Sequence, residues 1–319
     1  MKILITGVHG FVGSNLVEAL KGQHTIYGLD IIAPVKDGVR FTFSWDYLDK
    51  PNEIPEVDAI IHLAGKAHDT KNQSAAEVYF KVNTGLTEKI FDWFLKQPKC
   101  KKFVFSSTAK AAADKVEGVL TEDVVPAPVG PYGESKIAAE RYILDKVNGS
   151  EFMVNGSAKQ VYIFRPCMIH GPGNKGNLNL LYNVVKKGIP WPLGAFENRR
   201  TFTSVENICF AVNGVLTKDV PSGIYNMGDD EALSTNELIE EICKSLGKKA
   251  HIWKLPKGLM NGVAKVGGWL HLPLNPERLR KLTENYISSN EKIKKALGVT
   301  KMPVDARTGL QATLKSFKN

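Results

Sequence analysis

The feature that most constrains this chain is a glycine-rich turn between its first apolar run and its first helical pattern. Gly7, Gly10 and Gly13 follow directly after the expected strand Ile3–Thr6. Glycine permits a tight turn, close approach of the backbone to a pyrophosphate, and close packing of a helix on a strand. The free N–H groups at the start of the expected helix Phe11–Leu20 would bind the anion. The spacing therefore favours a dinucleotide site, although an ordinary glycine-rich βα turn produces the same pattern.

An acidic residue follows where this kind of site requires one. The second expected strand, Thr25–Asp30, ends on a carboxylate about 20 residues beyond the loop. A carboxylate at that position accepts hydrogen bonds from the ribose hydroxyls and repels a 2′-phosphate. The sequence therefore favours NAD over NADP, while Lys36 and Arg40 keep NADP open.

The remainder of the first half alternates short apolar runs with helical patterns. Further strands are expected at Ala59–Leu63, Phe103–Ser106 and Val161–Arg165, and helices at Glu77–Phe94 and Ile137–Val147. Strands separated by helices form βαβ units with parallel strands and right-handed crossovers. We therefore predict an α/β fold with a parallel sheet.

The second half differs in composition, and a smaller lobe is expected there. From Pro166 onward the chain is rich in Gly, Pro and Asn. A capping box that begins at Ser234 starts a helix that stops at Gly247, and a last helix begins near Asp305. The predicted domains are a dinucleotide-binding domain over 1–165, with a returning segment around 200–228, and a C-terminal substrate-binding lobe over 166–319.

The net charge raises the question of partners. It is +9, from 42 Lys and Arg against 33 Asp and Glu, and would suit nucleic acid, an anionic membrane, phosphorylated substrates or simple solubility. Many lysines stand in pairs without interleaved aromatic residues, so solvated faces explain them better than a nucleic-acid site. These pairs are Lys101–Lys102, Lys186–Lys187, Lys248–Lys249 and Lys294–Lys295. We expect no nucleic-acid partner.

Membrane contact is suggested only by the apolar segment 255–274, which contains Trp269. Because Lys257, Lys265 and His271 interrupt it, a packed helix of the second lobe is the favoured interpretation. No stretch reaches the roughly 20 apolar residues of a membrane span. We expect no membrane partner.

Cysteine and histidine spacing indicates neither a metal site nor a disulfide framework. The four cysteines form no CxxC pair, and histidines such as His68 and His170 are isolated and expected to be structural. Nothing at the N-terminus resembles a secretory signal. The chain is therefore expected to be a cytoplasmic protein without a bound metal.

A tyrosine and a lysine stand four residues apart at the start of an expected helix, as Tyr132 and Lys136. This spacing puts a phenol and an ammonium on one face, one turn apart. A nearby lysine and a positively charged nicotinamide ring would both lower the tyrosine pKa and make the phenolate available as a base. The pair is common by chance. It becomes specific because a dinucleotide loop and the cluster Ser106–Thr108, at the carboxyl end of a strand, precede it.

Together these motifs resemble the extended short-chain dehydrogenases/reductases of the NAD-dependent epimerase/dehydratase family. The resemblance covers almost the whole chain in the expected order. It implies a Rossmann-type, doubly wound parallel sheet with a smaller C-terminal lobe, NAD as the cofactor and a nucleotide-sugar substrate. The matching segments are Gly7–Gly13, Asp30, His62–Gly65, Val82–Thr84, Phe105–Thr108, Tyr132–Lys136, Arg165–Pro166, His170–Gly173, Arg199–Val205 and Tyr225–Gly228.

The resemblance also implies roles for individual residues. Tyr132 would be the catalytic base, Thr108 would contact the substrate, and Lys136 would hold the nicotinamide ribose. Asp46 and Tyr47 would lie against the adenine. The implied cofactor-binding residues are Gly7, Gly10, Phe11, Val12, Asp30, Asp46, Tyr47, Leu63, Ala64, Gly65, Asn83, Ser106, Tyr132 and Lys136. The implied substrate-binding residues are Thr108, Tyr132, Asn177, Leu178 and Arg200, of which the last three would contact a nucleoside diphosphate.

The segment after Ser107 restricts the reaction. Dehydratases of the family have an acidic pair there, whereas this chain has Ser-Thr-Ala-Lys, so dehydration is disfavoured. Two reactions remain: C4 epimerisation of a UDP-hexose or UDP-N-acetylhexosamine through a transient 4-keto intermediate, and NAD(P)H-dependent reduction of a 4-keto nucleotide sugar. A non-catalytic dinucleotide sensor is a remote alternative. Such proteins tend to lose the Tyr or the Lys, and this chain has both.

Two further expectations come from the resemblance. The segment Ala111–Asp114 departs from the family's usual pattern, which leaves the identity of the sugar open. Arg199-Arg-Thr-Phe202 is similar to a subgroup that includes enzymes of surface-polysaccharide synthesis. The family would form a homodimer through the helices that follow Asn83 and Tyr132.

Overall fold

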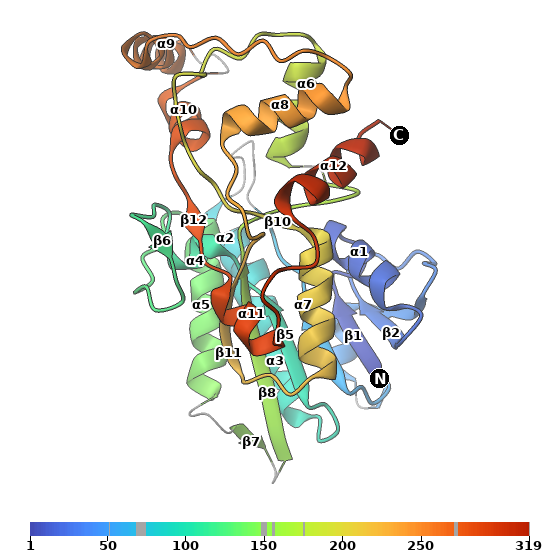
Figure 1. Ribbon diagram of the computed structural model, residues 1–319. Coiled ribbons are helices and arrows are strands. Elements are labelled where there is room, and N and C mark those ends of the chain that lie inside the picture. Colours follow the sequence, from blue (N-terminus) through green and yellow to red (C-terminus); the bar gives the residue numbers. More distant parts are fainter. Residues whose placement is uncertain are drawn as a thin grey trace.

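A parallel sheet lies at the centre of the larger part of the molecule (Figure 1). The computed structural model describes residues 1–50, 52–67, 75–147, 152–154, 157–174, 176–270 and 274–318. The strand order is β11-β8-β5-β4-β1-β2-β3, and each neighbouring pair is parallel. These strands are β1 (Lys2–Thr6), β2 (Thr25–Leu29), β3 (Val39–Phe43), β4 (Ala59–His62), β5 (Lys102–Ser106), β8 (Ser157–Pro166) and β11 (Gly223–Met227).

The strand order confirms the doubly wound fold. It reverses direction between β1 and β4, which is the switch point where open α/β sheets bind their ligands, beyond the carboxyl ends of the strands. The antiparallel strand β7 (Phe152–Val154) extends the start of β8. The turns of the chain that matter for function therefore follow β1, β4, β5 and β8.

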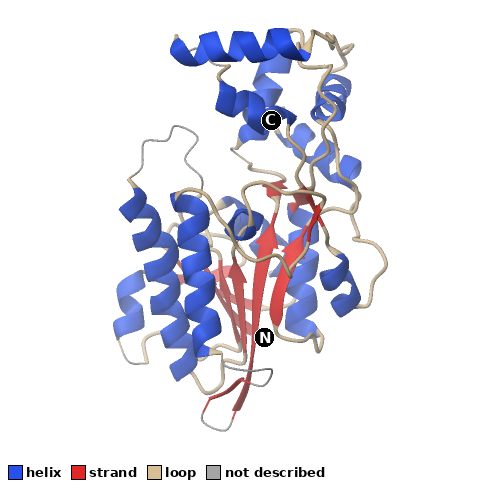
Figure 2. Ribbon diagram, turned by 90° about the vertical axis from the view of Figure 1, so that its left-hand side faces the viewer, coloured by secondary structure: helices blue, strands red, loops and turns tan. Residues whose placement is uncertain are grey.

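Helices cover both faces of the sheet (Figure 2). Because side chains alternate along a strand, Ile3 and Ile5 pack into one buried layer while Leu4 packs into the other. The first layer includes α1 (Phe11–Leu20) and α7 (Val205–Thr217), and the second includes α3 (Leu86–Lys96) and α5 (Pro131–Lys146). Burial on both faces explains why the strands are almost continuously apolar.

The chain crosses between the sheet and the lobe more than once. After β8 it enters the lobe, returns through α7 and β11, and returns again through α11 (Glu291–Leu297), which packs against both. The remaining elements are η1 (Trp45–Asp49), α2 (Ala76–Tyr79), η2 (Phe80–Gly85), α4 (Ala109–Ala112), β6 (Val119–Leu120), β9 (Met168–His170), α6 (Asn177–Lys186), β10 (Phe202–Ser204), α8 (Thr235–Ser245), α9 (Lys257–Trp269), α10 (Pro276–Thr283), β12 (Ile287–Ser288) and α12 (Ala306–Ser316).

Local capping rules account for the helices of the lobe. Ser234 and Glu237 form the expected reciprocal capping box at the start of α8, and Gly247 has a positive φ of 68° after its end. The side chain of Asp305 accepts a hydrogen bond from Thr308 N at the start of α12. A core of apolar residues from α6, α8, α9, α10 and α12 holds these helices together.

The helix expected over 77–94 is interrupted in the structure. A π-helical segment, η2, separates α2 from α3. The wider turn places Asn83 in the interior, where its side chain bonds the backbone of Lys66 and the hydroxyl of Ser135. Insertions of this kind often mark functional sites. Hydrophobic periodicity did not reveal the interruption, because buried side chains occur both before it, as with Tyr79, and after it, as with Ile90 and Phe91.

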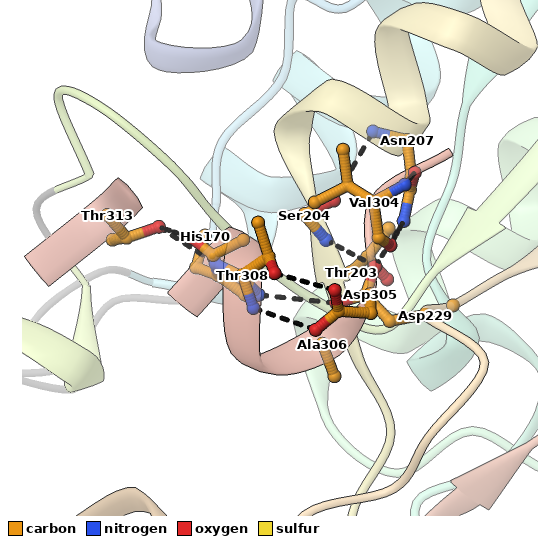
Figure 3. Close-up of polar contacts among 12 residues, drawn as sticks. His170, Thr203, Ser204, Asn207, Asp229, Val304, Asp305, Ala306, Thr308 and Thr313 are labelled. Atoms are coloured by element: carbon orange, nitrogen blue, oxygen red, sulfur yellow. Dashed lines mark hydrogen bonds and ion pairs between the residues drawn. The ribbon is translucent and has the colours of Figure 1, made fainter. Parts of the chain in front are cut away.

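A buried polar cluster fixes the last helix against the junction of sheet and lobe (Figure 3). Nδ1 of His170 lies 2.9 Å from the hydroxyl of Thr313 on α12, and Nε2 lies 3.4 Å from Asp229 Oδ2. Oδ1 of Asp229 accepts hydrogen bonds from Ser204 N and from Asn207 Nδ2. His170 therefore has a structural role, as expected.

Two lysines have roles that composition did not suggest. The ammonium of Lys102 donates to the carbonyls of Val215, Leu216 and Lys218 at the end of α7. That of Lys159 donates to three carbonyls at and beyond the end of α3. Cations at a helix C-terminus satisfy its free carbonyls and oppose its dipole. The expectation that the paired lysines lie on solvated faces is therefore wrong for Lys102. It is also wrong for Lys294, which is buried and paired with Asp230 and Glu291.

Candidate functional site

The glycine loop follows β1 at the switch point of the sheet. Gly7 has a φ of 68°, and a Cβ there would lie 2.9 Å from Ala64 N. A Cβ on Gly13 would lie 2.3 Å from the carbonyl oxygen of Gly7, so neither position accepts a side chain without rearrangement. Helix α1 begins at Phe11, and no side chain caps its first N–H groups. Those groups are arranged to bind an anion, as a dinucleotide pyrophosphate requires.

Asp30 is held beside this loop. Its Oδ2 accepts a hydrogen bond from His9 N at 3.0 Å, and its Oδ1 accepts one from Ile31 N. The carboxylate thus stands at the carboxyl end of β2, where the ribose of a dinucleotide lies in this fold. Lys36 donates to Ser14 Oγ at 2.8 Å, on the first turn of α1.

The predicted adenine contacts lie on η1, directly after β3. Tyr47 packs against Phe43, with ring centroids 5.4 Å apart. Asp46 is exposed, and hydrogen bonds from Ser44 and Lys50 lower the pKa of its carboxyl to about 2. Its charge is therefore already paired with groups of η1 and its flanks.

A chain of hydrogen bonds supports the backbone after β4. Leu63 N and Ala64 N both donate to Thr6 Oγ1, so the single hydrogen of that hydroxyl points to His62 Nδ1, 2.6 Å away. His62 Nε2–H then donates to Thr87 Oγ1 at 2.9 Å, and Thr87 donates to Asn83 O. This chain assigns one tautomer to His62 and fixes the peptides expected to line the cofactor.

Burial of His62 makes the stability of the protein sensitive to acid. Burial lowers the pKa of His62 well below 6.5, and the positive charge of Lys136 contributes to the shift. As the pH falls below 6.5 the unfolded chain takes up a proton that the folded chain does not. The free energy of unfolding therefore decreases on acidification, by about 1.4 kcal/mol per pH unit for this group.

Denaturant titrations at several pH values below 6.5 should show this slope, and a His62→Gln variant should show a shallower one. His9 and His24 also have lowered pKa values, but they titrate equally in both proteins, so the difference isolates His62. Equal slopes for the two proteins would contradict the assignment.

Asn83 connects this chain to the catalytic helix. Its Oδ1 accepts from Lys66 N at 2.7 Å, and its Nδ2 donates to Ser135 Oγ at 2.9 Å. The Ser135 hydroxyl donates in turn to the carbonyl of Tyr132. Gly65 lies against the same side chain, because a Cβ there would be 2.9 Å from Asn83 Oδ1 and 3.1 Å from Lys136 Nζ. The predicted residue Asn83 thus orients both the cofactor loop and the start of α5.

The three predicted catalytic residues meet at the carboxyl end of β5. Thr108 follows β5, while Tyr132 and Lys136 share one face of the first turns of α5. Lys136 is buried and its ammonium donates to the carbonyl of Ser106 at 2.8 Å. Burial lowers the pKa of Lys136 to about 8, against the opposing effect of Glu140.

The pKa of Tyr132 differs from the sequence prediction. Burial raises it, Tyr79 adds to the increase, and the hydrogen bond with Thr108 lowers it. The lysine was expected to lower this pKa, but the Lys136 ammonium is bonded to Ser106. In the protein itself, desolvation of the phenolate outweighs the hydrogen bond from Thr108.

A buried ion pair behind the catalytic residues was not predicted. Arg165, at the end of β8, donates from Nε to both oxygens of Glu140, and its Nη2 also bonds Glu140 Oε2, at 2.5 Å. Ser107 Oγ donates to the same carboxylate. Glu140 lies one turn after Lys136, and Ser107 precedes Thr108. Arg165 was among the segments that match the family, but nothing in the sequence paired it with Glu140.

The unusual segment after Thr108 forms the short helix α4. The Thr108 hydroxyl accepts a hydrogen bond from Lys110 N at the start of that helix. Lys110 Nζ contacts Asp114 Oδ1 at 2.6 Å, and Arg280 of α10 lies 3.4 Å from the same carboxylate. The Tyr286 hydroxyl donates to the carbonyl of Ala113. The segment therefore links the catalytic strand to the lobe.

The predicted substrate residues lie on separate elements of the lobe. Asn177 is exposed at the start of α6, and the side chain of Leu178 is buried in the lobe core. Arg200 pairs through its backbone with Leu233 and donates a side-chain hydrogen bond to the carbonyl of Lys281. Burial lowers the pKa of Arg200. Part of the guanidinium is thus already engaged within the lobe.

The described residues contain neither a metal-binding cluster nor a membrane-spanning helix. No group of three or more His, Cys, Asp or Glu there is arranged to hold a metal ion, and His68 lies outside the described part of the chain. Across those same residues, no helix has both the length and the apolarity that crossing a bilayer demands. The four cysteines are free.

The doubly wound sheet, the cradle around Gly7 and the Thr108, Tyr132 and Lys136 constellation define a dinucleotide-binding enzyme of the short-chain dehydrogenase/reductase class. Residues 3–228 match the NAD dependent epimerase/dehydratase family. The chain belongs to that family, and it is an NAD-dependent enzyme.

Individual relatives agree with this assignment. The chain is 31% identical over 271 residues to the UDP-glucose 4-epimerase of Vibrio cholerae, covering 80% of this chain and 78% of that one. It is 27% identical over 308 residues to the N-acetyl-alpha-D-glucosaminyl-diphospho-ditrans,octacis-undecaprenol 4-epimerase of Escherichia coli O157:H7, covering 93% and 86%. The solved structure of MoeE5 in complex with UDP-glucose and NAD shares the fold, with a TM-score of 0.76 at 21% identity over 100% of this chain and 99% of that one.

Proposed function

We propose that this protein is an NAD-dependent nucleotide-sugar 4-epimerase that acts on a UDP-hexose or UDP-N-acetylhexosamine through a transient 4-keto intermediate. The observation that carries the proposal is the meeting of Thr108, Tyr132 and Lys136 at the carboxyl end of β5, beside the glycine cradle. Relatives of the chain include two proteins named as 4-epimerases of glucose-type sugars.

The residues present fit NAD. The backbone N–H groups from Gly10 to Val12 would bind the pyrophosphate, and Asp30 would bind the adenosine ribose. Asp46 and Tyr47 would lie beside the adenine, and Leu63, Ala64 and Gly65 beside the rest of the cofactor. Bound NAD supplies a hydride acceptor at the sugar C4 and a positive charge that favours a nearby phenolate.

The side chains of the site would transfer one proton from the sugar and hold the substrate in place. Tyr132, as phenolate, would take the proton from the sugar O4, and the Thr108 hydroxyl would hydrogen-bond that oxygen. Lys136, whose ammonium donates to the Ser106 carbonyl, would also hydrogen-bond the nicotinamide ribose. Asn177, Leu178 and Arg200 would hold the nucleoside diphosphate while the 4-keto sugar rotates to present its other face. Leu178 would do so only through its backbone, since its side chain is in the lobe core.

We infer a place in surface-polysaccharide synthesis, a cytoplasmic location and a homodimer formed through α3 and α5. One relative is named for an N-acetylglucosaminyl diphosphate carried on undecaprenol, which supports the first inference. Free thiols suit a reducing compartment, which supports the second. The partly exposed Leu144 of α5 and Val78 of α2 supply apolar surface near the proposed dimer interface.

Purified protein incubated with UDP-glucose or UDP-N-acetylglucosamine tests the function directly. NMR should show inversion at C4 without added NAD(P)H, and the cofactor should remain bound after purification. Conversion of a 4-keto sugar that consumes one added NAD(P)H each turnover, without inversion of either UDP-sugar, would establish the reductase alternative instead. Cofactor binding without turnover of any of these would indicate the sensor.

Replacing Asp30 by Asn should weaken NAD binding by about 10- to 100-fold, since hydrogen bonds to a charged group contribute about 1.5–3 kcal/mol. The variant keeps the side-chain volume, and its remaining oxygen can accept one of the two backbone hydrogen bonds, from His9 N or from Ile31 N. Calorimetric titration of cofactor-free protein with NAD measures the effect. Asp37→Asn, which alters an exposed carboxylate paired with Lys21, is the matched control and should bind NAD normally. Equal NAD affinities for the two variants would exclude Asp30 from the site.

A further inference from the structure

Helix α9 stands at the far end of the lobe, away from the sheet (Figure 1). It is attached along one narrow stripe, because Met260, Ala264 and Gly267 are its buried residues. Their spacing of four and three residues places them on one side of the helix. Gly268 lies against Pro276 of α10, the neighbouring helix. Most of the surface of α9 therefore faces solvent.

An apolar stripe runs along this exposed surface. Leu259, Val263, Val266 and Leu270 recur at intervals of four, three and four residues, and each is between 46% and 55% exposed. Trp269, beside them, is 80% exposed. The sequence predicted a packed helix here; the structure has the helix but leaves this stripe unpacked. Contiguous exposed apolar surface of this kind marks an interaction site.

Basic residues lie on the opposite side of α9 from the apolar stripe. Lys257 and Lys265 are exposed eight residues apart on α9, so they share another side of the helix. Between Glu241 and Glu277 the sequence contains no acidic residue. The same stretch contains six lysines, namely Lys244, Lys248, Lys249, Lys254, Lys257 and Lys265. Helix α9 therefore presents apolar side chains on one side and positive charge on the other.

We propose that α9 docks the protein reversibly on an anionic lipid bilayer. Trp and aliphatic side chains on one side of a helix, with lysines on another, are the composition of helices that lie in the membrane interface. The apolar stripe would enter the boundary between headgroups and acyl chains, and the negative surface potential would attract the lysines on the other side of the helix. A second copy of this chain fits the surface less well, because it would bring two acid-free, lysine-rich stretches together.

Sedimentation with lipid vesicles tests the proposal. Vesicles of equal parts phosphatidylglycerol and phosphatidylcholine should bind the protein, and vesicles of phosphatidylcholine alone should bind it at least about tenfold more weakly. Trp269→Ser and the double variant Lys257→Glu/Lys265→Glu should each lose at least about tenfold in binding to the anionic vesicles. These side chains are exposed, so the variants should fold and keep their activity on a soluble UDP-sugar.

Matched controls distinguish vesicle binding through α9 from nonspecific adsorption of the protein to vesicles. Val125→Ser/Val129→Ser removes two exposed apolar side chains elsewhere, and Lys295→Glu reverses a distant exposed charge. Each should bind anionic vesicles like the parent. The proposal is overturned if the parent protein does not bind these vesicles, or if the controls lose as much binding as the α9 variants. It is also overturned if light scattering shows a dimer that Trp269→Ser converts to a monomer. Vesicle binding is measured without any sugar substrate, so its result does not depend on whether the protein is an epimerase.

Discussion

Replacing Tyr132 by Phe should lower kcat by about 10²- to 10⁴-fold, the range expected for loss of a general acid–base group. The substitution removes only the hydroxyl. The ring can keep its contact with Tyr79, 6.4 Å away between centroids, and the carbonyl of residue 132 can still accept the hydrogen bond from Ser135. NAD content should therefore stay close to that of the parent, so the loss is in the chemical step rather than in folding or cofactor binding.

Tyr142→Phe supplies the matched control for this substitution. It makes the same chemical change on the same helix, where the Tyr142 hydroxyl bonds Asp92 away from the cofactor loop. Its kcat should differ little from that of the parent. The measurement is C4 inversion of the UDP-sugar by NMR, together with cofactor absorbance of the purified variants. If Tyr132→Phe turned over as fast as Tyr142→Phe, Tyr132 would not be the base.

The position of Lys136 sharpens this expectation. Its ammonium donates to the carbonyl of Ser106, and burial lowers its pKa to about 8. Burial also raises the pKa of Tyr132, with Thr108 as the opposing hydrogen bond. The protein thus prepares the geometry of proton transfer, and the positive charge that favours the phenolate has to come in part from the bound cofactor.

The parts of the site that the sequence predicted are those encoded by short spacings. The glycines of the loop, Asp30 at the end of β2, and Tyr132 with Lys136 each depend on one turn or one strand end, where local geometry decides the outcome. Alternation of strands and helices was likewise enough to predict a parallel α/β sheet.

The parts it did not predict depend on contacts between distant segments. Lys102 reaches the end of α7 more than a hundred residues away, and Asn83 bonds Ser135 across two helices. Asn83 lies within η2, and the apolar period of the helix does not record that interruption. Exposure of Trp269 is also a tertiary property, because an apolar stripe has the same pattern whether or not another helix covers it.

The pairing of Glu140 with Arg165 leads to the largest expected loss of stability. Replacing Glu140 by Gln should lower the free energy of unfolding by about 3–5 kcal/mol. Arg165 is 1% exposed, and its Nη1 already lacks a hydrogen-bond partner among the described residues. The substitution would leave its guanidinium charge buried without a counter-charge.

A second variant distinguishes this cause from simple loss of packing. Glu140→Leu/Arg165→Met removes both charges, and buried ion pairs replaced by apolar residues of similar size often cost little. The double variant should therefore be more stable than Glu140→Gln in denaturant titrations of the NAD-saturated proteins. Glu277→Gln, in the exposed pair with Lys281, should change stability by less than about 1 kcal/mol. If the double variant were instead as unstable as Glu140→Gln, shape rather than charge would hold α5 to β8. The proposed catalytic residue Lys136, one turn from Glu140, would then depend on packing for its position.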